Sequence, residues 1–216
     1  MTNKLIALTL LIVSLACASA QGQAQTRTAS ANSYLARGDA FFDKGEYRRA
    51  LADYDLALAF DRQSAATWNK RALAHDQCGN LPGALDDFNQ ALALAPGSAV
   101  FLNNRARIFL QQGEIARALA DLNLAIERAP KFADAYAHRG LAQAAQDNLT
   151  AALADFDRAL QYNPKLIKTR FNRGLALLRM GREEEAERAF AEFRRMGGKF
   201  TAAQQQLFDQ LAGVKP

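Results

Sequence analysis

Arginine and aspartate recur along this chain at a constant interval of 34 residues, and together they could form either ion pairs or an anion-binding surface. The arginines are Arg37, Arg71, Arg105, Arg139 and Arg173, and the aspartates are Asp53, Asp87, Asp121 and Asp155. A row of unpaired guanidinium groups would suit an anionic ligand. We favour a structural row of ion pairs, because an internal guanidinium needs a partner and a carboxylate can bind it through two hydrogen bonds.

The order of these residues suggests how they pair. If each aspartate pairs with the arginine that follows it in the chain, as Asp53 would with Arg71, only Arg37 is left over, at an exposed end. The opposite choice would leave Arg173 unpaired beneath the C-terminal residues. We therefore predict pairing with the following arginine, and a loss of about 3–5 kcal/mol when one buried aspartate is removed.

No other set of residues has a spacing typical of catalysis or metal binding. His75 and His138 are the two histidines, and neither has a cysteine or carboxylate at metal-ligand spacing. The sequence contains no glycine-rich phosphate loop after a strand and no nucleophile elbow. We therefore predict that the protein is not an enzyme, binds no metal and needs no cofactor.

Small residues follow the same 34-residue interval. They indicate which secondary-structure elements position the row of arginines and aspartates, which we call the ladder. Blocks that begin at Ala31, Ala65, Ala99, Ala133 and Ile167 align without an insertion. Their eighth and twentieth places hold Gly or Ala throughout: Gly38, Ala72, Ala106, Gly140 and Gly174, then Ala50, Ala84, Ala118, Ala152 and Ala186. Because small residues let two helices approach closely, each block predicts a helix, a turn and a second helix.

Proline occupies the thirty-second place of three blocks, as Pro96, Pro130 and Pro164. With the period and the small crossing residues, this pattern resembles the tetratricopeptide repeat family. The resemblance covers residues 31–200 and implies an all-α fold, a right-handed α-solenoid of five helix-turn-helix repeats. The repeats would be residues 31–64, 65–98, 99–132, 133–166 and 167–200. The resemblance also implies recognition of proteins or peptides rather than catalysis.

The composition fits a single helical solenoid. Hydrophobic residues make up 50% of the 216 residues, prolines number 5, and the formal net charge is +5. Cys78 is the one cysteine outside the N-terminal segment, so the mature chain has no internal disulfide and must be held together by packing.

The first twenty residues have the pattern of a signal peptide. Lys4 precedes an apolar run from Leu5 to Ala16, and the small residues around Ala20 form a cleavage site. The run is shorter than the roughly 20 residues of a membrane-spanning helix. Cys17 raises the alternative of a lipoprotein, which we favour less because Ser14 stands where a lipoprotein signal usually has leucine. We predict cleavage after Ala20, a flexible leader at residues 21–30, and a periplasmic or secreted protein.

The C-terminal residues predict a helix that covers the last repeat. Gly197 and Gly198 end the preceding helix, and Thr201 with Gln204 forms a capping box. An apolar stripe follows, made by Ala202, Leu207, Phe208 and Leu211. A solenoid needs such a terminal element over its last apolar face, so we predict a capping helix and tail at residues 201–216.

In this family the ligand usually lies on the concave face made by the first helices. The resemblance places the following residues there: Leu35, Asp39, Phe42, Asn69, Leu73, Asp76, Asn103, Arg107, Leu110, Leu141, Lys168, Phe171 and Leu175. Their charges are mixed and leucines recur, whereas a nucleic-acid groove would show a basic stripe with stacking aromatics. The Lys and Asn clamp of chaperone-binding relatives is absent, since Leu35, Asp39, Lys70, Val100 and Asn104 take its places.

Two functions remain open. The chain resembles exported repeat proteins that help to assemble bacterial envelope machinery, which implies an adaptor or scaffold that binds a partly apolar peptide or helix in its groove. The alternative is a structural solenoid that self-associates into a homo-oligomer and holds no groove ligand. In either case we expect protein partners, no nucleic acid and no small-molecule substrate, and membrane attachment only if Cys17 is lipidated.

Overall fold

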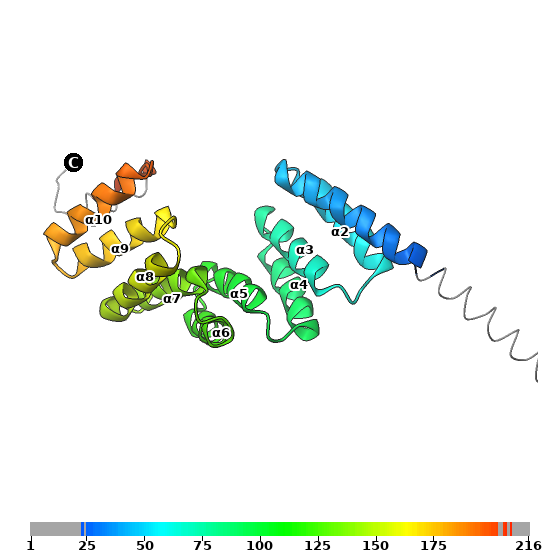
Figure 1. Ribbon diagram of the computed structural model, residues 1–216, viewed down its shortest axis with the longest axis horizontal. Coiled ribbons are helices and arrows are strands. Elements are labelled where there is room, and N and C mark those ends of the chain that lie inside the picture. Colours follow the sequence, from blue (N-terminus) through cyan, green and yellow to red (C-terminus); the bar gives the residue numbers. More distant parts are fainter. Residues whose placement is uncertain (1–22, 24, 203–204, 207, 209–216) are drawn as a thin grey trace, which may run out of the picture. The chain divides into compact units, whose positions relative to one another are not determined.

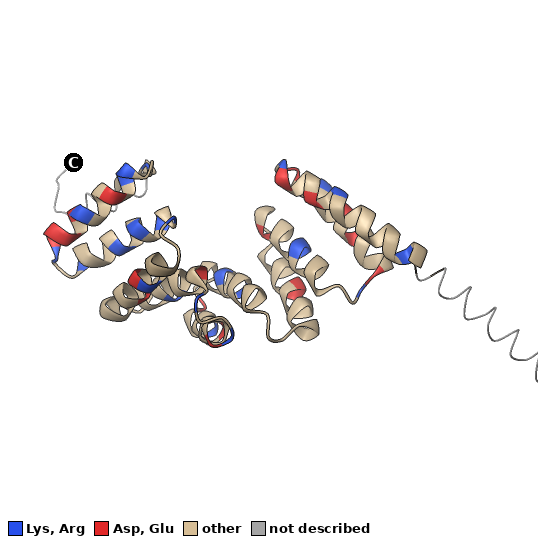
Figure 2. Cartoon of the chain, in the orientation of Figure 1, with Lys and Arg blue, Asp and Glu red and all other residues tan. Residues whose placement is uncertain are grey.

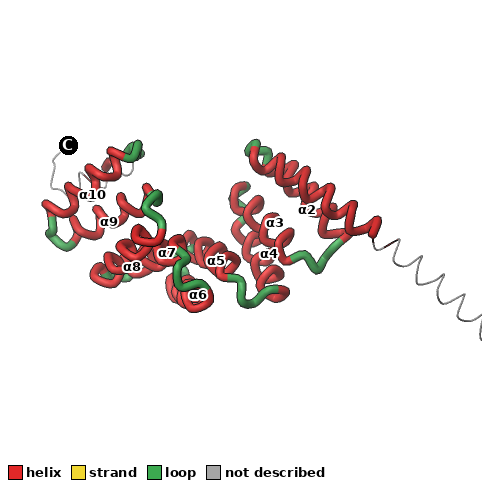
Figure 3. The backbone as a smooth tube through the Cα atoms, in the orientation of Figure 1, coloured by secondary structure: helices red, strands yellow, loops and turns green. Residues whose placement is uncertain are grey.

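The computed structural model describes residues 23, 25–202, 205–206 and 208, which form helices joined by short loops (Figures 1 and 3). The first helix covers residues 25–43. The others are α2 (Tyr47–Phe60), α3 (Ala65–Gln77), α4 (Leu81–Leu94), α5 (Ala99–Gln111), α6 (Ile115–Arg128), α7 (Ala133–Ala145), α8 (Leu149–Tyr162), α9 (Ile167–Arg179) and α10 (Glu183–Arg195). No strand occurs within the described ranges, and the predicted all-α repeat fold is confirmed.

The helices belong to two compact units, residues 1–96 and residues 97–216. In the first unit, α3 packs against both α2 and α4. In the second unit, each helix from α5 to α10 packs against the next, and α7 also contacts α5 and α9. Each unit is thus built from helix hairpins stacked on one another, while a single continuous solenoid across all five repeats stays a prediction.

The helices keep the period of the sequence. α3, α5, α7 and α9 begin at Ala65, Ala99, Ala133 and Ile167, the first residues of their predicted repeats. The turn between the two helices of a hairpin needs a residue with positive φ. Gly113 adopts φ 74° there, and Asp147 adopts φ 64° at the equivalent turn, since aspartate tolerates the left-handed region better than most residues.

Small residues let the paired helices approach, as the sequence predicts. A Cβ atom added to Gly140 would lie 2.6 Å from Cε1 of Phe156 and 3.1 Å from the backbone oxygen of Ala152. Ala118 is fully buried in α6. The space beside the eighth place is therefore filled by an aromatic ring of the second helix, and a side chain at Gly140 would have to displace it.

One prediction at the N-terminal end is wrong. Residues 25–30 were expected in a flexible leader, but they are helical and extend the first helix. The stretch from residue 23 contains neither Gly nor Pro, and its Ala, Gln and Arg residues have favourable helix propensities, so nothing stops the helix before this point. The predicted signal peptide at residues 1–20 lies outside the described residues. Within the described ranges, no helix is long and apolar enough to span a bilayer.

Phenylalanines form the core at the C-terminal end. Phe190 and Phe193 of α10 are buried, and the rings of Phe200 and Phe208 lie 5.8 Å and 5.1 Å from the ring of Phe190. These two residues supply apolar cover to the last hairpin. Leu207, Leu211 and most of the tail lie outside the described residues, so the capping helix itself stays a prediction.

Candidate functional site

In the first unit, four helical residues predicted for the inner face lie at or near one hollow of about 330 Å³. Asp39, Phe42 and Leu73 line it together with Tyr54 and Lys70. Asp39 accepts hydrogen bonds from the Tyr54 hydroxyl at 2.9 Å and from Nζ of Lys70 at 2.5 Å. Leu35, the fourth, packs beside this hollow against the Ala50 and Tyr54 core. The hollow thus combines apolar walls with an ordered carboxylate.

Tyr54 is a component of this hollow that sequence reasoning missed. Its position marks it as a bulky residue beside a helix crossing, and its ring is buried against Gly38. Burial and the hydrogen bond to Asp39 raise the pKa of Tyr54, so the hydroxyl stays protonated and keeps donating to Asp39. The phenol therefore fixes the orientation of the carboxylate in the hollow.

In the second unit, Leu141 and Leu175 line a second hollow of about 260 Å³ between α7 and α9. Leu141 is 37% exposed, which leaves an apolar surface open to a ligand. Asn172 and Arg179 supply polar groups at its edge. Arg179 donates to the backbone oxygen of Ala144 at 3.0 Å and to Asp147 at 2.6 Å, so its guanidinium ties α9 to the C-terminal end of α7.

Not every predicted inner-face residue is available to a ligand. Phe171 is 2% exposed, and its ring lies 5.3 Å from that of Phe200 and 5.5 Å from that of Phe193. It belongs to the C-terminal core, because the large side chains that follow the last repeat cover it. The prediction that Phe171 lines the groove is wrong.

The two asparagines predicted for the inner face are also buried. Asn69 is 8% exposed and Asn103 is 5% exposed. The Nδ1 atom of His138 lies 2.7 Å from Oδ1 of Asn103 and can donate to it, which links α5 to α7. Burial lowers the pKa of His138, and this keeps the ring neutral. Asn103 therefore serves helix packing rather than ligand binding.

The other predicted residues keep some exposure, with Asp76, Arg107 and Leu110 half-buried and Lys168 exposed. Lys168 lies on α9, a helix with basic residues and no acidic residue (Figure 2). The three arginines of α9 lie beside carboxylates of other segments. Arg173 binds Asp157 of α8, and Arg170 lies 3.6 Å from Glu192 of α10. Arg179 binds Asp147. α9 is therefore not an unpaired basic stripe.

The arginine and aspartate ladder forms, but in the opposite direction to the one predicted. Arg105 binds both oxygens of Asp121 at 2.8 Å, and Arg139 binds both oxygens of Asp155 at 2.8 Å. Arg37 pairs with Asp53 and Arg71 pairs with Asp87 in the same way. Each aspartate thus pairs with the preceding arginine, across the two helices of one hairpin.

A second row of acceptors, which the sequence analysis overlooked, joins successive hairpins. Nη1 of Arg71 also binds Asp55 at 2.5 Å, and Nη1 of Arg139 also binds Asn123 at 2.9 Å. Nε of Arg173, which has no aspartate in its own hairpin, binds Asp157 at 2.6 Å. The sequence contains a signal for this second row, because Asp or Asn stands two residues after every aspartate of the ladder.

Comparisons with known proteins agree with this architecture. Family profiles described as TPR repeat and tetratricopeptide repeat match residues 38–77, 65–98 and 103–166, which together make up more than half of the chain. The chain belongs to the tetratricopeptide repeat family. No curated protein matches this tetratricopeptide repeat chain significantly over its sequence.

Solved structures of other tetratricopeptide repeat proteins share the fold. PilW, described as a widely conserved type IV pilus biogenesis factor, has a TM-score of 0.77 at 22% identity, over 85% of this chain and 84% of that one. Pseudomonas aeruginosa PilF has a TM-score of 0.76 at 21% identity, over 88% and 86%. YrrB, described as having an unusual peptide-binding site, has a TM-score of 0.61 at 19% identity, over 84% and 91%. These structures share the fold with this chain, and the family match gives it the scaffold fold of tetratricopeptide repeat proteins, which is of the protein–protein interaction type.

Proposed function

We propose that this protein is an adaptor of the bacterial cell envelope that binds a partly apolar peptide or helix through the inner-face hollows of its hairpins. The observation that carries the proposal is the hollow between α7 and α9, where Leu141 and Leu175 present apolar surface beside polar groups. Helix-in-groove and extended-peptide recognition both need this combination of apolar pockets and polar edges.

The hollow of the first unit adds a charged feature to the same kind of surface. Phe42 and Leu73 can contact an apolar side chain, while Asp39 is held in place by Tyr54 and Lys70. Because both partners of Asp39 are ordered, a ligand that hydrogen-bonds here meets groups that lose little freedom on binding. The resemblance to YrrB, a protein described as binding a peptide, supports this mode.

The envelope location rests on the N-terminal sequence and on two relatives. Residues 1–20 have the charge, apolar run and small residues of a cleaved signal. PilW is described as a factor in the biogenesis of the type IV pilus, an envelope structure, and PilF shares the fold. We propose that the mature chain begins at Gln21 and works in the periplasm or outside the cell, with lipidation at Cys17 as the less favoured route.

A peptide display library tests the binding proposal. We expect the wild-type protein to enrich peptides with apolar residues, and Leu141→Glu with Leu175→Glu to abolish that enrichment by placing charges in the apolar contact. Leu56→Glu is the matched control, because Leu56 is 41% exposed on α2 and lines neither hollow. Its enrichment should equal that of wild type.

Two results would overturn the proposal that the protein is an adaptor. One is equal enrichment by the double variant while its circular dichroism and melting stay near those of wild type. The other is a mass from light scattering that rises with concentration to a stable oligomer, together with no enrichment by the wild type. The second result would favour the self-associating solenoid.

A further inference from the structure

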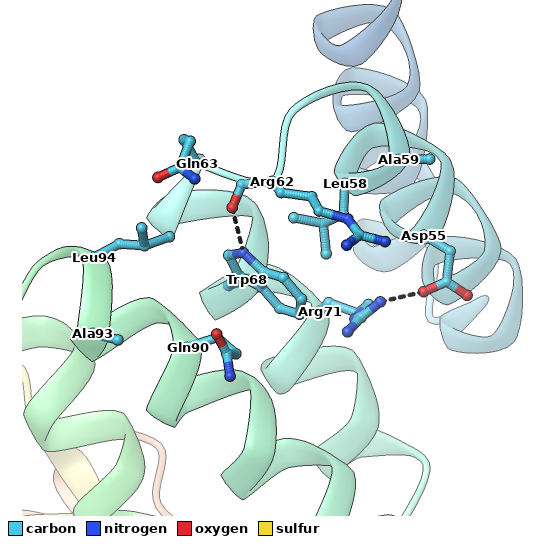
Figure 4. A pocket seen from close by; sticks show the side chains of 10 residues that line it. All are labelled: Asp55, Leu58, Ala59, Arg62, Gln63, Trp68, Arg71, Gln90, Ala93 and Leu94. Atoms are coloured by element: carbon cyan, nitrogen blue, oxygen red, sulfur yellow. Dashed lines mark hydrogen bonds and ion pairs between the residues drawn. The ribbon is translucent and has the colours of Figure 1, made fainter.

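A third hollow, of about 540 Å³, lies in the first unit around Trp68 (Figure 4). Helices α2, α3 and α4 all contribute to it. Leu58 comes from α2 and Leu94 from the end of α4, and the indole of Trp68 from α3 lies between them. None of these residues lines the inner-face hollow of the same unit. The hollow is therefore a separate surface, independent of the proposed adaptor site.

The hollow lacks a second ring that two of the other hairpins have, whereas the third and fifth hairpins have no ring at either place. In the first hairpin the rings of Tyr34 and Phe60 stack at 5.7 Å, and in the fourth the rings of Tyr136 and Tyr162 lie 5.6 Å apart. The second hairpin has Trp68 at the first of these places and Leu94 at the second. Leucine is too short to cover the indole as a ring does, and Leu94 is itself 38% exposed.

A departure from the repeat pattern brings a positive charge to the same hollow. Three repeats have proline at the place where the first repeat has Arg62. The backbone oxygen of Arg62 accepts the hydrogen bond of the Trp68 indole at 2.9 Å, and its side chain extends over the hollow toward the indole (Figure 4). Arg62 is exposed, and its guanidinium has no acidic partner among the described residues.

The other charges of the hollow are already satisfied. Arg71 lies over the Trp68 ring at 4.7 Å from its centroid and binds both Asp55 and Asp87. One face of the indole therefore already carries a cation, and the Asp55 carboxylate is engaged. A cationic ligand would compete with Arg71, whereas an anionic group would meet the unpaired guanidinium of Arg62.

We propose that this hollow binds an acidic peptide segment of a partner protein, in which a large apolar side chain stands next to Asp or Glu. The apolar side chain occupies the space over the Trp68 indole, between Leu58 and Leu94, which a ring fills in the first and fourth hairpins. The neighbouring carboxylate binds the guanidinium of Arg62. The uncovered indole and the exposed arginine thus serve one ligand.

The chain carries its own probe for this site, because Trp68 is its single tryptophan. The test is a titration of the full-length mature protein with two capped synthetic peptides, one with Phe-Glu at its centre and one with Phe-Gln, followed by tryptophan fluorescence. We expect both to change the emission of Trp68, and the Phe-Glu peptide to bind about fivefold more tightly, as a partly exposed ion pair would give.

Two variants introduce residues that other repeats of this chain have at the equivalent places, Phe60 for Leu94 and Pro96 for Arg62. Leu94→Phe should fill the hollow and abolish the fluorescence response to both peptides. Arg62→Pro should keep the response but remove the difference between Glu and Gln peptides. Both variants should fold as wild type does, which circular dichroism checks. The Leu141→Glu and Leu175→Glu double variant should respond as wild type does, because its substitutions lie at the other site.

Several results would overturn this proposal. They are no fluorescence change with either peptide, equal affinity for the two peptides in wild type, or an unchanged response in Leu94→Phe. A change in Trp68 emission on concentrating the protein without peptide would show that a second copy of the chain occupies the hollow instead. Failure of the adaptor proposal leaves these measurements unaffected, since they report on Trp68.

Discussion

The direction of the arginine and aspartate ladder can be tested with two aspartates on one helix. Asp155 and Asp157 both lie on α8, but Asp155 binds Arg139 within its hairpin and Asp157 binds Arg173 of the next hairpin. We predict that Asp155→Ala lowers the free energy of unfolding far more than Asp157→Ala. Both variants gain the same helix propensity from alanine, so that contribution cancels in the comparison.

The magnitude follows from exposure and from what each arginine keeps. The Asp155 side chain is 10% exposed and that of Arg139 is 24% exposed, so removing Asp155 leaves a largely buried cation. Removing one partner of a fully buried pair costs about 3–5 kcal/mol. Arg139 retains its 2.9 Å hydrogen bond to Asn123 and some contact with water, so we expect about 2–3 kcal/mol.

The control variant, Asp157→Ala, should lose only what an exposed ion pair contributes. The Asp157 side chain is 57% exposed, and exposed pairs contribute about 0–1 kcal/mol. Urea unfolding measures both losses, and thermal melting should show Asp155→Ala lower by about 5–10 °C for a chain of this size. Equal losses, or a larger loss for Asp157→Ala, would refute the view that the pair within the hairpin carries the stability.

Three further predictions concern packing, pH and processing. Ala118→Leu should overpack the fully buried crossing in α6 and lower the free energy of unfolding by about 1–3 kcal/mol, and unchanged urea unfolding would contradict the packing. Burial lowers the pKa of His138, so the unfolded chain takes up this proton first, and stability should fall from about pH 7 to pH 5 more steeply in wild type than in His138→Gln. Melting at several pH values checks this, and equal slopes would contradict it. Intact mass of the exported protein should correspond to a chain that starts at Gln21, whereas a lipid adduct on Cys17 would show lipoprotein processing.

The helical repeat could be predicted from the sequence because one physical requirement recurs at fixed places. Two helices that touch need small residues at the contact, and Gly140 shows how little room is left there. Nothing else in the chain competes with that pattern. The extension of the first helix to residue 25 could not be predicted in the same way, because the repeat pattern begins only at Ala31 and says nothing about where the helix starts.

The pairing of the ladder could not be derived from the interval alone. An interval of 34 residues relates each aspartate equally well to the arginine before it and to the one after it. The pairing depends on which helices face each other. The two helices of one hairpin place Arg105 directly opposite Asp121. The argument from Arg173 failed because it ignored Asp157, an acceptor two residues further along the same helix as Asp155.

Positions in a repeat also fail to predict exposure at the ends of an array. Leu141 and Phe171 both occupy places that line the inner face in this family, yet Leu141 is 37% exposed and Phe171 is 2% exposed. The difference comes from Phe193 and Phe200, which lie against Phe171 and follow no repeat pattern. A rule based on position describes the middle of an array, while the side chains of the last hairpin depend on the residues that cover it.

Departures from the repeat therefore carry information that the repeat itself does not. A residue that recurs in four of the five hairpins meets a need of the fold, as the buried aspartates do. Arg62 stands where three other repeats have proline, and Leu94 stands where the first and fourth hairpins have a ring. Both residues line the hollow at Trp68, although 32 positions separate them in the chain. That convergence on one surface is the reason to expect a ligand there, and Arg62→Pro and Leu94→Phe, which introduce residues that other repeats have at these places, test it without disturbing the hairpin.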